Sequence, residues 1–219
     1  MMNEPIPKDL VVLVADKNME FAVKGLLSRP RALGVCPITS DLFVHPYRDP
    51  GCLLVGHNFL RPLVNRYSYA LVIFDREGCG RERLSREELE QQVEDRLSQS
   101  GWGDRAASIV LDPELEVWVW SDSPHVESVL GWSGRQPDLR TWLAEKGFAE
   151  VNALKPNRPK EATQAALRLV RKHRSSALYF QLATKVSFKR CIDPAFFKFK
   201  AILRNWFSEE QPLAKENEI

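Results

Sequence analysis

The sequence predicts an α/β protein with a parallel-dominated sheet sandwiched by helices, followed by a basic and mainly helical C-terminal extension. Apolar runs at residues 10–14 and 71–74 are typical of strands that are buried on both faces. Segments with the helical spacing of apolar residues alternate with such strands along the chain. Acidic residues follow several of the strands directly, at the sheet edge where open α/β sheets bind their ligands.

The first two strands are predicted at residues 9–16 and 41–46. The segment "DLVVLVAD" holds five consecutive apolar residues, and "NMEFAVKGLLSR" after it has the apolar spacing of a helix for which Asn18 is the candidate N-cap. The shorter "DLFVHP" supplies the second strand. In "GHNFLRPLVNRY" (residues 56–67) we expect a helix, which Pro62 restricts to a late start or a kink.

The third and fourth strands are predicted at residues 70–75 ("ALVIFD") and 106–113 ("AASIVLDP"). Between them, "LSREELEQQVEDRLSQ" predicts a helix with Ser85 as its N-cap and Glu88 three residues later, which is the pattern of a capping box. Strands that alternate with helices four times predict a parallel sheet.

The chain is expected to divide into an α/β domain at residues 1–130 and a basic helical region with an acidic tail at residues 131–219. Residues 151–204 contain 13 Lys and Arg but only two acidic residues. Within them, "KEATQAALRLVRKHR" predicts an amphipathic helix with Ala162, Ala165 and Leu169 facing inward. The basic side chains of such a segment either form the solvent-exposed faces of its helices or bind nucleic acid. The candidate nucleic-acid contacts are Lys155, Arg158, Lys160, Arg171, Lys172, Arg174, Lys189 and Arg190.

Carboxylates are concentrated where the predicted strands end. Asp16 follows the first strand, Asp75 and Glu77 follow the third, and Glu114 and Glu116 follow the fourth. Because the carboxyl ends of parallel strands meet at one edge of a sheet, we expect these side chains to lie near one another. Grouped carboxylates repel, and a hard cation such as Mg²⁺ would offset that repulsion. Strand-end acids that simply face solvent are the alternative.

Composition excludes several classes of protein. No segment has the roughly 20 apolar residues that a membrane span requires, and the start "MMNEPIPKDL" lacks the features of a signal peptide. The four cysteines form no CxxC pair and no Cys/His cluster, which argues against a zinc site. We therefore expect a cytoplasmic protein with reduced cysteines and no membrane partner.

Three segments, "LVVLVADKNMEFAVKGLL", "ALVIFDREGC" and "DPELEVWVWSD", resemble the acidic motifs of the TOPRIM fold. The nearest likeness is to the small stand-alone group related to OLD nucleases in bacterial anti-phage defence systems, and it covers residues 9–125. The resemblance implies a nuclease that depends on Mg²⁺ or Mn²⁺ and acts on nucleic acid. It also implies other defence-system proteins, such as an ATPase, as partners.

The resemblance further implies roles for individual residues. Members of the family usually carry glutamate directly after the first strand, where this chain has Ala15, so Asp16 or Glu20 would have to substitute for it. Because Ala15 is expected at a strand end, a glutamate at that position should be tolerated. The implied metal ligands are Asp75, Glu77, Glu114 and Glu116, and the implied catalytic residues are Asp16, Glu20, Asp75 and Glu116.

Three functions stay open at this point. The acids of "DRE" and "ELE" favour a Mg²⁺-dependent nuclease of a defence system, whereas Ala15 favours a catalytically degenerate TOPRIM-like subunit that binds nucleic acid or partner proteins. The third is an unrelated metal-dependent phosphatase or nucleotide-processing enzyme, which the lack of a DxDx[TV] motif disfavours. His45, after the second strand, is a candidate either to orient a phosphate or to serve the fold.

Overall fold

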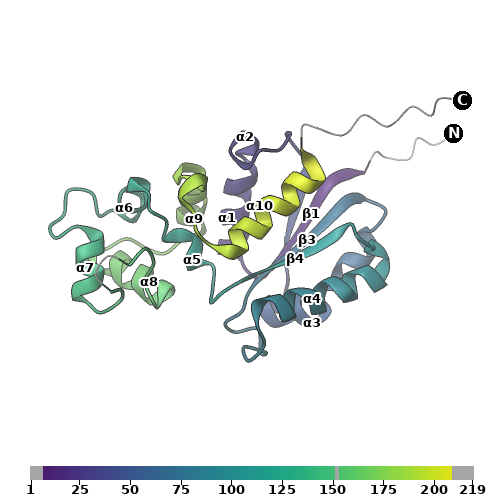
Figure 1. Cartoon of the computed structure of the whole chain (residues 1–219), viewed down its shortest axis with the longest axis horizontal. Helices are drawn as coiled ribbons and strands as arrows, with labels where there is room; N and C mark the ends of the chain where they lie inside the picture. The colour runs from purple at the N-terminus through teal and green to yellow at the C-terminus, as the bar shows by residue number, and fades with distance from the viewer. Residues whose placement is uncertain (1–6, 151–152, 209–219) are drawn as a thin grey trace, which may run out of the picture.

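A four-stranded sheet lies between two layers of helices (Figure 1) in the protein, whose computed structural model describes residues 7–150 and 153–208. All neighbouring strands are parallel, in the order β2-β1-β3-β4. The predicted α/β class with a parallel sheet is therefore confirmed. The strands are β1 (Lys8–Val14), β2 (Ser40–Val44), β3 (Tyr67–Asp75) and β4 (Ala106–Leu111).

The register brings the carboxyl ends of the strands to one edge of the sheet. Val14 pairs with both Val44 and Ile73, and Asp75 pairs with Leu111. The chain leaves β1 towards β2 on one side, while β3 and β4 lie on the other side. The strand order therefore reverses between β1 and β3, and such a switch point opens a crevice outside the carboxyl ends.

Helices cover both faces of the sheet (Figure 1). Ser85 accepts a hydrogen bond from the Glu88 amide, and the Glu88 side chain bonds back to the Ser85 amide, so the predicted capping box is confirmed. One face carries α1 (Lys17–Leu27), α2 (Pro30–Leu33) and α10 (Pro194–Phe207), and the other carries α3 (Arg48–Leu60) and α4 (Arg86–Leu97).

Four short helices lie beyond the carboxyl ends of the strands, at the left of Figure 1. This helical cap consists of α5 (Glu116–Val119), α6 (Pro124–Leu130), α7 (Leu139–Glu145) and α8 (Pro159–Leu169). The chain then returns through α9 (Ser176–Lys185), which packs along α1. Gly25 allows this close packing, because a Cβ at that position would lie 2.7 Å from the Ala183 Cβ. Three short turns complete the elements: η1 (Arg61–Leu63), η2 (Ser98–Trp102) and η3 (Phe188–Arg190).

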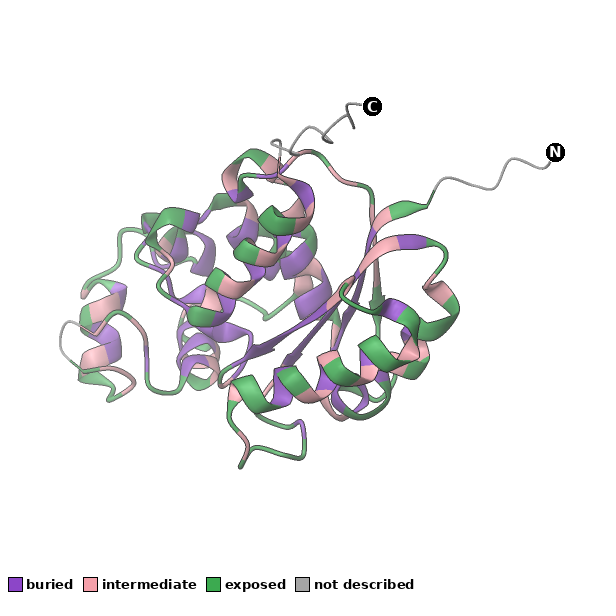
Figure 2. Cartoon of the chain, turned by 45° about the vertical axis from the view of Figure 1, so that its right-hand side comes forward, coloured by how far each residue is buried: buried purple, intermediate pink, exposed green. Residues whose placement is uncertain are grey.

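The buried core runs from the sheet into the cap (Figure 2). Core residues of the strands belong to the same cluster as Leu139, Ala162 and Leu203. Residues on both sides of position 130 therefore share one core. Within the described residues, no helix combines the length and the apolar character needed to cross a membrane.

Three local predictions are wrong. The N-cap of α1 is Asp16, and Asn18 lies within the helix. The helix expected at residues 56–67 is α3, which begins at Arg48 and has already ended at Leu60 before Pro62. Gly51 lies near the start of α3, and glycine disfavours a helix, so the sequence does not indicate this start. Glycine is required at this position because a Cβ there would clash with His45 Nδ1. On α8, Leu169 was expected to face inward but is 49% exposed, because the buried face is formed by Ala162, Thr163, Ala166 and Leu167.

Candidate functional site: a carboxylate cluster at the sheet edge

Every strand is followed by an acidic residue at the carboxyl edge of the sheet. Asp16 follows β1, Asp49 lies in the first turn of α3 after β2, Asp75 ends β3, and Glu114 and Glu116 come after β4. The charges of the other four all act on Asp75 and raise its pKa. We call these five residues the carboxylate cluster. The charges of Asp16, Glu114 and Glu116 reach Asp75, as expected for acids that follow strands ending at one edge of the sheet.

Asp75 is the centre of this cluster. Burial is the main cause that raises its pKa well above the usual value, and the charges of Asp49 and Glu116 are the next causes. Its Oδ1 atom is buried and has no hydrogen-bond partner among the described residues. A buried carboxylate oxygen without a hydrogen-bond donor lowers the stability of the fold. A cation or a hydrogen-bond donor that binds this atom would therefore stabilise the site.

Asp49 is the residue of the cluster that sequence reasoning missed. Its Oδ1 accepts a hydrogen bond from the backbone amide of Asp75 at 2.9 Å, and burial raises its pKa. The same rule of acids after strands could have found it in "VHPYRD". It was overlooked because it lies five residues beyond β2, in a helix that was expected to begin later.

Glu114 and Glu116 are buried and already bonded to cations of the cap. Glu114, which is 2% exposed, accepts hydrogen bonds from the backbone amide of Lys160 at 3.1 Å and from its Nζ at 2.7 Å. Glu116, which is 1% exposed, accepts from Arg174 Nη2 at 2.7 Å and from the Tyr179 hydroxyl. The cluster therefore contains two cations among five carboxylates and remains short of positive charge.

These cations respond to the cluster in turn. Burial alone would lower the pKa of Lys160, but its hydrogen bond to Glu114 and the charges of Glu114, Glu116 and Asp75 raise it. Burial alone would also lower the pKa of Arg174, but its hydrogen bond to Tyr179 and the charge of Glu116 raise that pKa. Both side chains therefore stay protonated at the sheet edge.

Asp16 has a second role within the cluster, while Glu20 and Glu77 lie outside it. Asp16 caps α1, because its Oδ1 accepts a hydrogen bond from the Met19 amide at 2.8 Å. Glu20 points along α1 and forms ion pairs with Lys17 and Lys24. Glu77 is exposed on the loop after β3, and its charge contributes to the raised pKa of Glu114. Glu20 is thus occupied by neighbours on its own helix.

Oxygen ligands of this kind suit a hard divalent cation. The cluster offers only carboxylates, which Mg²⁺ and Mn²⁺ prefer as ligands. A bound ion would give Asp75 Oδ1 the partner that it lacks among the described residues. Among the residues that the structure describes, no three His, Cys, Asp or Glu side chains are already arranged to hold a metal ion. The donor chemistry fits, and Glu114 and Glu116 would have to exchange Lys160 and Arg174 for the ion.

The predicted nucleic-acid contacts separate into two groups. Several are used within the fold: Lys155 pairs with Asp193 at 2.8 Å, Arg158 lies over the ring of Phe148, and Arg190 donates to the Asp122 carbonyl. Lys189 is exposed on η3. Lys160 bonds to Glu114, and Arg171, Lys172 and Arg174 gather at the end of α8. A shallow groove there is lined by Arg168, Arg171, Lys172, His173 and Arg174, with Gln164 and Leu167 completing its wall.

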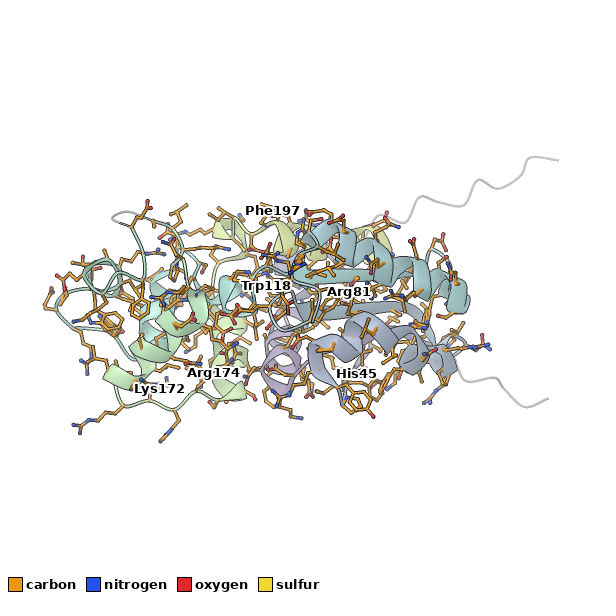
Figure 3. The ribbon with its side chains drawn as sticks, turned by 90° about the horizontal axis from the view of Figure 1, so that it is seen from below. His45, Arg81, Trp118, Lys172, Arg174 and Phe197 are labelled. Carbon is orange, nitrogen blue, oxygen red and sulfur yellow. The ribbon has the colours of Figure 1, made fainter. Side chains whose placement is uncertain are left out.

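We call this feature the basic groove. In Figure 3, Lys172 and Arg174 mark it on the cap, and Arg174 lies towards the sheet. Arg174 is therefore shared by the basic groove and the carboxylate cluster, since its guanidinium also bonds to Glu116. A positive groove beside a negative cluster is an arrangement that suits a phosphodiester and a divalent cation together.

His45 has a position that serves the fold. It is buried, and its Nδ1 accepts a hydrogen bond from the Tyr47 amide at 3.1 Å. Its ring packs against Phe59, and burial lowers its pKa. The neutral ring therefore supports the start of α3, on which Asp49 lies.

Comparisons with protein-family models, with curated proteins and with solved structures find no match for this chain. The chemistry of the site is therefore inferred from its own geometry.

Proposed function

We propose that this protein is a TOPRIM-like nuclease component of a bacterial anti-phage defence system, which acts in the cytoplasm and cleaves phosphodiester bonds with the help of Mg²⁺ or Mn²⁺. The observation that carries the proposal is Asp75, whose buried Oδ1 has no hydrogen-bond partner among the described residues while the charges of four other carboxylates raise its pKa. An arrangement that gathers negative charge at a switch point is costly for the fold alone. An activity that depends on a bound cation would explain why the chain keeps this unfavourable group of carboxylates.

The residues of this chain would divide the work. Asp75, Asp49 and Asp16 form no ion pair among the described residues, so these three would need only to approach one another to receive a cation. Glu116 and Glu114 would be further ligands once Arg174 and Lys160 turn away. A bound divalent ion would supply a more acidic water and neutralise charge on the phosphate. The basic groove would hold the negatively charged backbone and align it beside the cluster.

A catalytically degenerate subunit is the second candidate, and Ala15 favours it. Ala15 is 1% exposed and lies in the core, so the chain lacks the family's leading glutamate at a place where none could easily be added. The expectation that Ala15→Glu would be tolerated is therefore corrected: a carboxylate buried there should lower stability. In this case the protein would bind nucleic acid or another defence protein, such as an ATPase, without cutting.

A cleavage assay distinguishes the two candidates. Wild type, Asp75→Asn and Asp16→Asn are compared with Mg²⁺ and Mn²⁺ on single-stranded DNA, double-stranded DNA and RNA. Asparagine is as good an N-cap as aspartate, so Asp16→Asn removes the charge and keeps the start of α1. Asp104→Asn, in the exposed turn before β4, is the matched control.

The nuclease proposal expects cleavage by wild type and by the Asp104→Asn control, and none by Asp75→Asn. A wild type that cuts no substrate with either metal, yet binds nucleic acid, would support the degenerate subunit. Cleavage that Asp75→Asn leaves intact would place the activity away from the carboxylate cluster.

A further inference from the structure

Arg174 belongs to two sites that carry opposite charge. On one side its Nη2 donates to Glu116 at 2.7 Å and its Nε donates to the Tyr179 hydroxyl at 2.6 Å. On the other side it forms part of the wall of the basic groove. A single guanidinium cannot keep its bond to Glu116 and also align fully with a phosphate in the groove, so ligands of the two sites compete for it.

The basic groove is built to receive negative charge. It is lined by four Lys and Arg side chains and a histidine, with no acidic residue among its lining. Arg168 and Arg171 are exposed and form no ion pair within the described parts of the chain. Arg171 adopts a left-handed backbone conformation, with φ at 56°, which turns the chain at the end of α8 and presents the following cations on one side.

The groove is also anchored to the cap. Lys172 Nζ donates to the carbonyl of Val129 at 2.5 Å, which ties the turn after α8 to α6. Arg174 therefore has a fixed neighbour on the groove side and a buried acceptor, Glu116, on the cluster side. A rotation of this one side chain would exchange the two partners without moving the helices.

The exchange has a consequence for the carboxylate cluster. Glu116 is among the acids whose charge acts on Asp75. The Oδ1 atom of Asp75 has no hydrogen-bond partner in the described part of the chain. If Arg174 turned to a phosphate in the groove, the cluster would lose one of its two cations and attract a divalent ion more strongly. Conversely, an ion bound by Glu116 would release Arg174 towards the groove.

We propose that the basic groove binds the phosphate backbone of a nucleic-acid strand and that Arg174 couples it to the carboxylate cluster, so that strand and divalent cation each strengthen the binding of the other. This inference rests on the proposed function, because it takes the cluster to be the cation site. Thermodynamic reciprocity requires that the coupling be equal in both directions.

The test measures Mn²⁺ affinity of the full chain by electron paramagnetic resonance, with and without a short phosphorothioate oligonucleotide that resists cleavage. In wild type we expect the oligonucleotide to tighten Mn²⁺ binding by about five-fold or more. Arg174→Gln should bind Mn²⁺ more tightly than wild type when no oligonucleotide is present, and the oligonucleotide should no longer change that affinity.

Two matched variants separate the groove from the coupling. Arg171→Gln should weaken oligonucleotide binding while a saturating oligonucleotide still tightens Mn²⁺ binding. Lys146→Gln, which removes an exposed cation after α7, should behave like wild type in both measurements. If Arg174→Gln fails to fold, the wild-type measurement alone still decides whether the two ligands are coupled.

The outcomes that contradict the inference are distinct. Mn²⁺ binding that the oligonucleotide leaves unchanged in wild type overturns the coupling but leaves the proposed function intact. A groove that binds no oligonucleotide, and instead binds an acidic protein surface, overturns the assignment of its ligand. Wild type that binds no Mn²⁺ in any arm overturns the proposed function, and this inference with it.

Discussion

Asp41 and Asp75 lie at opposite ends of the same sheet and have opposite environments. At the amino end, Asp41 accepts hydrogen bonds from Lys8 Nζ at 2.7 Å and from the Tyr67 hydroxyl at 2.5 Å, where Lys8 and Tyr67 are the first residues of β1 and β3. The bond to Lys8 is the main cause that lowers the pKa of Asp41. At the carboxyl end, Asp75 is surrounded by other acids and its pKa is raised.

The comparison distinguishes Asp41, whose charge stabilises the fold, from Asp75, whose charge destabilises it. Asp41 has a charge partner and donors for its oxygen atoms, whereas a buried oxygen of Asp75 has none among the described residues. Opposite charges that are hydrogen-bonded contribute to stability, and like charges that are buried reduce it. We therefore expect the same substitution, Asp to Asn, to have opposite effects at the two ends.

Cleavage should show the largest difference. Removing even an outer partner of a metal ligand costs about 10–100-fold. Under the proposed function Asp75 is itself a ligand, so Asp75→Asn should reduce the Mg²⁺-dependent rate by more than about 100-fold. Asp41→Asn should retain the wild-type rate, because Asp41 is at the far end of the sheet. Initial cleavage rates of both variants on a labelled oligonucleotide test this prediction. Equal losses of rate in the two variants would show that Asp75 has no special role in cleavage.

The pH dependence of stability should differ next. The folded protein holds a proton on Asp75 more tightly than the unfolded chain does. Between the unfolded carboxyl pKa of about 4 and the raised pKa of Asp75, the folded state therefore binds more protons and loses stability as pH rises. Asp75→Asn should flatten this decline in chemical unfolding experiments with EDTA.

Asp41 should have the opposite dependence. Its pKa is lowered in the folded protein, so the stability it contributes is present above the unfolded pKa of about 4 and is lost as pH falls through the lowered value. Asp41→Asn should therefore matter at neutral pH and cease to matter in acid. A substitution effect at Asp41 that does not change with pH would show that its charge is not what stabilises the fold.

Thermal stability at neutral pH should change by smaller amounts and with opposite signs. Asp41→Asn removes a partly exposed ion pair worth about 1 kcal/mol or less, which corresponds to a fall in Tm of about 2–4 °C at most. Asp75→Asn should raise Tm in EDTA, because it relieves repulsion from four acids. Differential scanning calorimetry checks both signs, and a fall in Tm for Asp75→Asn would mean that its charge serves the fold.

The salt dependence of nucleic-acid binding should change least. Each phosphate contact contributes about one unit to the slope of log affinity against log salt concentration. Replacing Arg168 by Gln should therefore reduce the slope by about 1, whereas Lys8→Gln at the amino end should leave it unchanged. Fluorescence anisotropy over a range of salt concentrations measures the slopes.

The strands were predictable because their signal is local. The valine-rich runs around Val12 and Val72 bury both faces of a strand, and the capping box at Ser85 marks a helix start without reference to the rest of the chain. The start of α3 was not predictable, because Gly51 is there for a contact with His45 that only the fold creates. Helix-period reasoning likewise misjudged Leu169, since α8 ends at that residue.

The site was predictable to the same extent. Asp16, Asp75, Glu114 and Glu116 follow strands, and parallel topology brings strand ends together. What the sequence could not supply is the identity of their partners. Lys160 and Arg174 lie 46 and 58 residues beyond Glu114 and Glu116, respectively, and reach them only because the cap folds back over the sheet edge.

Mn²⁺ binding to wild type and to Asp75→Asn, measured side by side with Asp104→Asn by isothermal titration calorimetry, tests the central claim most directly. We expect wild type and the Asp104→Asn control to bind Mn²⁺ with equal affinity and Asp75→Asn to bind it more than about 10-fold more weakly. Equal Mn²⁺ affinity in wild type and Asp75→Asn, or no binding to wild type, would contradict the assignment of the carboxylate cluster as a cation site.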